Sequence, residues 1–125
     1  MERRKAMDAL IKEKLYRAGI ETDSAIERFM GNEALYERFA LGFTEDRNYE
    51  TLLKAMEAGD TKTAFTAAHT LKGVCGNLSF TGLLRAVADI VEPLRAGKLE
   101  TAKAVLPQLT EQYEKTTEAL KEWKG

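Results

Sequence analysis

The chain has 125 residues, of which 44% are hydrophobic and 31% charged, and its formal net charge is −1 at pH 7. This length and composition suit one domain with a hydrophobic core and a well-solvated surface. A pI of about 5.9 without a dense basic stripe argues against nucleic-acid binding, and no run approaches the roughly 20 apolar residues of a membrane span.

The single cysteine allows no internal disulfide, and Met1 leads into an amphipathic segment instead of a signal peptide. Both features predict a cytoplasmic protein.

The charge is uneven along the chain, because residues 21–60 carry ten acids and four bases, whereas residues 61–98 carry five bases and two acids. A modest positive field over the second segment would favour an acidic partner site, although ordinary charge scatter explains the difference as well.

Short helices are predicted for the first part of the chain. Residues 4–17 carry apolar side chains at helical spacing, and Gly19 ends the segment. We interpret residues 1–19 as an N-terminal helical extension to a domain over residues 20–125. Ser24 to Glu27 has the pattern of a capping box and opens a second short helix.

Asn32 can cap a third helix, and Asp60 can cap the helix that contains the only histidine. Between them, residues 48–58 form another helical segment, which Gly59 ends. The third helix would point five side chains inward: Leu35, Tyr36, Phe39, Ala40 and Phe43.

The stretch from Ala64 to Leu78 is predicted as one helix. Its apolar side chains form a single broad stripe on a helical wheel, the face that a bundle helix buries: Ala64, Ala67, Ala68, Leu71, Val74, Cys75 and Leu78. His69 lies almost opposite this stripe and therefore points outward. Gly73 and Gly76 lie on the same face as His69, and Lys72 lies at its edge.

Two glycines on the histidine face need a reason, because each interior helical glycine costs roughly 1 kcal/mol relative to alanine. They provide clearance for something that approaches His69, or the helix simply ends at Gly76 and Asn77. The pattern alone leaves both explanations open.

Two further helices complete the chain, over residues 81–96 and about 99–123. Pro93 and Pro107 fall inside them and should kink or interrupt each helix. The last helix has a seam with bundle spacing, which predicts packing within a monomer in preference to a dimer. Short connections favour antiparallel neighbours, so the predicted fold is all-α, an antiparallel up-and-down four-helix bundle with N-terminal helical additions.

The sequence H-T-L-K-G at residues 69–73, with glycine again at Gly76, resembles the histidine-containing phosphotransfer (HPt) domain of phosphorelays. The resemblance covers roughly Ile20 to Trp123. One departure is Ser79, where the family usually has another glycine. The resemblance implies that His69 accepts a phosphoryl group from a receiver-domain aspartyl phosphate and passes it to another receiver aspartate.

The same resemblance implies response-regulator receiver domains as partners, and a hybrid histidine kinase as a further one. The receiver would supply the acidic pocket and Mg²⁺, so no cofactor is expected on this chain. The sequence has no Walker loop and no kinase-like glycine box, which predicts a carrier without an ATP site and not an enzyme. One histidine and one cysteine on opposite sides of a helix do not make a metal site.

Several neighbours of His69 are candidates for partner docking: Lys62, Phe65, Thr66, Gly73 and Gly76. Phe65 can instead pack against a neighbouring helix. Lys72 could reach the phosphoryl group with its ammonium or could be an ordinary surface lysine. The alternative function is a helical adaptor that binds a partner through the Phe65–Gly76 face without phosphorylation.

Overall fold

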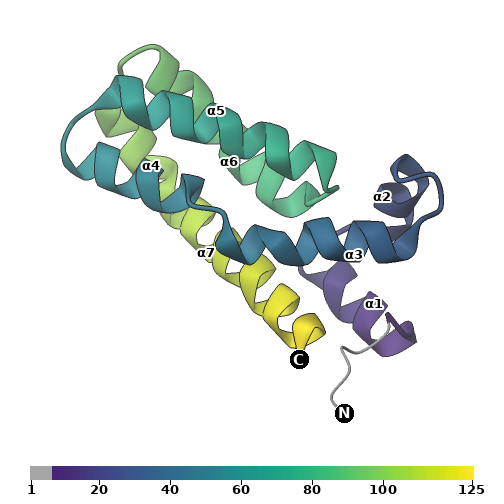
Figure 1. Ribbon diagram of the computed structural model, residues 1–125. Helices are drawn as coiled ribbons and strands as arrows, with labels where there is room; N and C mark the ends of the chain where they lie inside the picture. The colour runs from purple at the N-terminus through teal and green to yellow at the C-terminus, as the bar shows by residue number, and fades with distance from the viewer. Residues whose placement is uncertain (1–6) are drawn as a thin grey trace.

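The computed structural model describes residues 7–125 as a bundle of antiparallel helices (Figure 1). Its central part consists of α4 (Asn48–Glu57), α5 (Thr61–Asn77), α6 (Thr81–Arg95) and α7 (Leu99–Lys124). Each helix packs on the next in the chain, and connections of only three residues join them. Such short connections make neighbouring helices antiparallel, and the predicted all-α four-helix bundle is confirmed.

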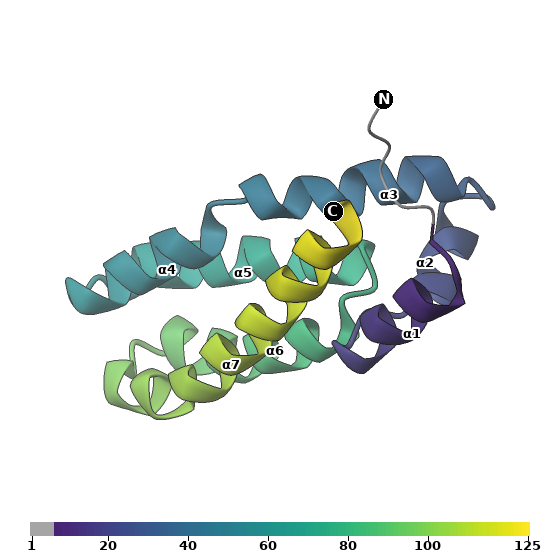
Figure 2. The same cartoon turned by 90° about the horizontal axis from the view of Figure 1, so that it is seen from below.

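The helix α3 (Glu33–Gly42) and the 3₁₀ turn η1 (Phe43–Glu45) precede α4. In Figure 2, α3 and α4 lie end to end along one side of the bundle, with α5 beside them and with α6 and α7 beyond. The bundle closes between its first and last helices, because the Tyr49 and Tyr113 rings stack at 3.8 Å and the Tyr49 hydroxyl bonds Thr110 Oγ1 at 2.8 Å.

The short helices α1 (Ala9–Arg17) and α2 (Thr22–Arg28) lie at the end of the bundle where α5 finishes (Figure 1). In α1, Ile11 and Leu15 are buried and belong to the same hydrophobic core as the bundle helices. Gln112 of α7 donates a hydrogen bond to the Ala18 carbonyl at 2.8 Å. The described part of the predicted extension therefore packs on the bundle.

Helix starts agree with the predicted caps at two positions and differ at one other. Asn32 Oδ1 accepts the Leu35 N–H at 3.0 Å, and Asp60 Oδ1 accepts the Thr63 N–H at 3.0 Å. The predicted Ser24 capping box is wrong, because α2 already begins at Thr22. The start predicted at residue 4 lies outside the described residues, within which α1 begins at Ala9.

The two prolines do not interrupt their helices, because α6 continues through Pro93 and α7 through Pro107. A proline removes its own N–H donor and its ring crowds the carbonyl four residues earlier, but buried side chains hold each helix on both sides of it. In α6 these are Ile90 and Leu94; in α7 they include Ala102 and Leu109. Packing thus keeps both helices continuous, and the predicted interruption does not occur.

The third helix points most of its predicted side chains inward, with one exception. Tyr36, Ala40 and Phe43 are buried, and Leu35 is half-buried. Phe39 is 54% exposed, which corrects the prediction. Its ring lies 5.7 Å from that of Phe29, the residue that follows α2.

Candidate functional site

The candidate site lies on the exposed face of α5. The opposite face of this helix is buried in the core and consists largely of alanines. Small side chains allow α4 and α6, which both contact α5, to approach its backbone closely. Because this packing fixes the rotation of α5 about its axis, His69 is exposed to solvent, as the helical wheel predicted.

Both glycines of the histidine face are helical, since α5 runs through Gly73 and Gly76 and ends at Asn77. A Cβ built at either position would meet no atom within 4 Å beyond its own local backbone. Packing inside the described molecule therefore does not require glycine at either position. The left-handed residue after the helix is Ser79, with φ of 56°, so neither glycine is needed for the turn.

The His69 imidazole stacks on the ring of Phe65, one turn earlier in α5. The ring centroids are 5.6 Å apart and the planes are 24° from parallel. Phe65 is half-buried, and the Arg95 guanidinium of α6 lies 4.7 Å from the centre of its ring. Phe65 therefore contacts both a neighbouring helix and the histidine.

The other predicted site residues also lie on this face. Lys62, Thr66 and Lys72 are exposed. The Thr66 hydroxyl donates to the Lys62 carbonyl at 3.2 Å, which is an ordinary bond within a helix. Within residues 7–125 the Lys72 ammonium has no ion-pair or hydrogen-bond partner. A helical side chain leans toward the N-terminus, so Lys72 leans toward His69.

Two arginines near this face were not predicted from the sequence. Arg28 of α2 donates to the Gly76 carbonyl at 2.6 Å, and Arg95 lies over Phe65. Both contacts join segments far apart in the chain. In the sequence, each arginine is an ordinary basic residue in the last turn of its own helix. No local pattern could have identified them.

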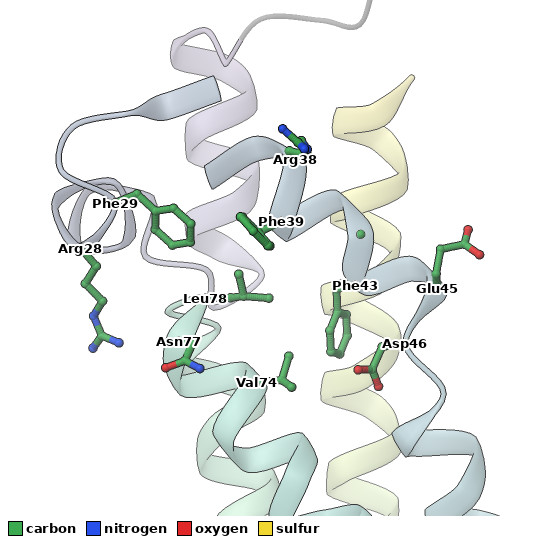
Figure 3. Close-up of a pocket in the computed structure, with 11 residues that line it drawn as sticks. Arg28, Phe29, Arg38, Phe39, Phe43, Glu45, Asp46, Val74, Asn77 and Leu78 are labelled. Carbon is green, nitrogen blue, oxygen red and sulfur yellow. The ribbon is translucent and has the colours of Figure 1, made fainter. Parts of the chain in front are cut away.

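An apolar groove of about 810 Å³ lies beside the C-terminal end of α5 (Figure 3). Phe29 and Phe39 contribute its aromatic wall, and Val74, Asn77 and Leu78 line it from α5 and its cap. His69 is not among the lining residues. The groove is therefore next to the candidate site and separate from it.

Cys75 lies on the buried face of α5 and is fully buried. Burial raises the pKa of its thiol to about 12, and the negative charge of Asp46 acts in the same direction.

Among residues 7–125, no three His, Cys, Asp or Glu side chains are grouped so that they could hold a metal ion. No helix in the described chain has the length and apolar character needed to cross a bilayer.

The sequence model of the Hpt domain family matches residues 44–122 of the chain, from η1 to the last turn of α7. This match covers more than half of the sequence, and the chain belongs to the Hpt domain family. Members of this family are phosphotransfer carriers of two-component signalling that interact with receiver and kinase domains. Neither the curated proteins nor the solved structures contain a significant match.

Proposed function

We propose that His69 carries a phosphoryl group between receiver domains. The lone pair of an unprotonated imidazole nitrogen, Nε2, forms a bond to phosphorus. The bond between phosphorus and the carboxyl oxygen of the donor aspartate breaks, and its electron pair leaves on the carboxylate. The reverse reaction on a second receiver returns His69 to its starting state. Phosphoryl transfer of this kind depends mainly on positioning and charge stabilisation.

The observation that carries this proposal is the exposure of His69, beside Gly73, on a helix whose opposite face is buried in the core. His69 is the only histidine of the chain, and the glycine one turn later leaves open space next to it. A receiver domain must bring its aspartate to within bonding distance of the imidazole. An exposed ring with no side chain at position 73 supports such an approach.

Charge around the site supports the same role. Lys72 is one turn after His69 and leans toward it, so its ammonium can reach a phosphoryl group on the imidazole. Residues 61–98 carry five bases and two acids, which suits an acidic partner. In this proposal the receiver contributes Mg²⁺ and its acidic pocket, and the chain itself needs no cofactor.

The direct test is phosphorylation of the purified protein by a phosphorylated receiver domain in the presence of Mg²⁺. Intact-mass measurement should show the addition of one phosphate that is lost in acid, as a phosphoramidate requires. His69→Gln should abolish the added mass, while Thr70→Ala, the exposed neighbour in α5, should keep it. Undiminished acid-labile labelling of the His69→Gln variant would contradict the assignment. Binding of the receiver without any labelling of the parent would favour the adaptor function.

A further inference from the structure

The geometry points to Phe65 and Arg95 as positioning residues for His69: the Phe65 ring orients the imidazole, and Arg95 holds that ring in place. This inference rests on the proposed function, since it concerns how the accepting nitrogen is presented.

The first step is the contact between the two rings. Phe65 and His69 are four residues apart on α5, so they are neighbours on the helix surface. Their nearly parallel planes and the 5.6 Å between centroids describe an offset stack, which is a favoured arrangement of aromatic rings. An exposed imidazole otherwise turns freely about its side-chain bonds. Stacking selects the orientations in which its plane follows that of Phe65.

The second step is the support of Phe65 itself. One side chain of α6, Arg95, places its guanidinium carbon 4.7 Å from the centroid of the ring, which is within the range of a cation–π interaction. Arg95 Nε in turn bonds both carboxylate oxygens of Glu92, each at 3.2 Å. Phe65 is also half-buried against the hydrophobic core. The ring is therefore held by the core and by α6, and not only by its own helix.

Together, the Phe65–His69 stack and the Arg95–Phe65 contact connect the orientation of the exposed imidazole to a residue of α6. Arg95 does not need to touch His69 or the phosphoryl group for this role. It acts through Phe65 and limits the movement of the ring on which the imidazole stacks. A docking contact, by comparison, would affect the partner and leave the imidazole unchanged.

The first measurement is NMR of the imidazole ring. His69 is the only histidine, so its two ring C–H signals are unambiguous, and the Phe65 ring current should displace them from their values in a free peptide. Arg95→Gln should move the signals toward the free-peptide values, and Arg95→Lys, which keeps a cation, should restore them in part. Arg85→Gln, an exposed arginine of the same helix, is the matched control and should leave them unchanged.

The second measurement is the rate of phosphorylation by two donors, a phosphorylated receiver domain and the small molecule phosphoramidate. Phe65→Leu should slow labelling by both donors about three- to tenfold, the size expected for loss of one ring-stacking contact, and Phe65→Tyr should keep the parent rate. Melting temperatures identify any variant that is simply less folded.

Three results would overturn the inference. Unchanged imidazole signals in the Arg95→Gln variant would show that Arg95 does not hold the stack. A Phe65→Leu variant that is slow with the receiver and normal with phosphoramidate would show a docking contact only. Equal rates for parent and Phe65→Leu with both donors would show that orientation is unimportant. Failure of the proposed function is distinguishable, because the parent would then show displaced signals but no label at His69.

Discussion

At the scale of single residues, substitutions at Gly73 should affect the stability of the fold and the rate of phosphotransfer in different ways. No atom beyond its own local backbone lies within 4 Å of a Cβ added at this position, and alanine is a better helix former. We therefore expect Gly73→Ala to keep or raise the free energy of unfolding, by up to about 1 kcal/mol. Gly73→Gln should fold equally well but slow phosphotransfer strongly, because its side chain leans toward His69.

Melting temperature and transfer rate on both variants check this prediction. Thr70→Gln is the matched control, since Thr70 is also an exposed residue of α5 but is not one of the docking candidates, and it should transfer at the parent rate. A Gly73→Gln protein that folds and transfers at the parent rate would show that the glycine provides no clearance.

Cys75 should be an inert thiol in the folded protein. Because burial raises its pKa from the ordinary 9.0 to about 12, almost no reactive thiolate exists at neutral pH. Labelling by a thiol reagent should be slow in buffer and fast in denaturant. In the folded protein the rate should also keep rising with pH beyond 9, where an exposed thiol would level off. Rapid native labelling would refute the burial of this face of α5.

At the scale of elements, the turn between α5 and α6 contains one residue, Ser79, whose conformation a glycine would adopt at lower cost. Ser79 adopts a left-handed conformation, with φ of 56°, which costs a residue with a Cβ roughly 1 kcal/mol or more. Its hydroxyl is buried without a hydrogen-bond partner in the described structure. Ser79→Gly removes both penalties and should raise the free energy of unfolding by about 1 kcal/mol.

The transfer rate of the Ser79→Gly variant should stay at the parent value, because the turn lies beyond the end of α5 and away from His69. Denaturant unfolding and the transfer assay together test this. Ser79→Ala is the informative comparison, since it removes the hydroxyl but keeps the strained backbone. Equal stability of the parent and both variants would show that the turn carries no such cost.

At the scale of the whole molecule, α1 should unfold together with the bundle although it lies outside the segment that matches the family. Leu15 is 1% exposed and belongs to the common core. Leu15→Ala should therefore lower the free energy of unfolding by about 2–4 kcal/mol in a single transition. Leu10→Ala is the control on the same helix, because Leu10 is 63% exposed and its truncation should change little.

Denaturant titration followed by circular dichroism measures both α1 variants. If the Leu15→Ala protein kept the parent transition, or unfolded in two separate steps, residues before the bundle would be an independent extension and not a part of the core.

Much of the fold could be predicted from the sequence, because helix formation and the burial of one helical face are local properties. The spacing of alanines and leucines in α5 fixed which face is buried, and that in turn placed His69 outside. Asn32 and Asp60 were identifiable as caps because a cap bonds an N–H only three residues away. Ser24 was misassigned because the same local chemistry is also compatible with a position inside a helix.

The tertiary structure alone decided the contacts between distant segments. Phe39 follows the apolar period of α3 and is nevertheless half-exposed, and α6 and α7 continue through prolines that should weaken them. The link from Arg95 through Phe65 to His69 joins two helices, and the Arg28 bond to Gly76 joins α2 to α5. Periodicity along one helix specifies which residues face inward, but it carries no information about which residue of another helix lies opposite.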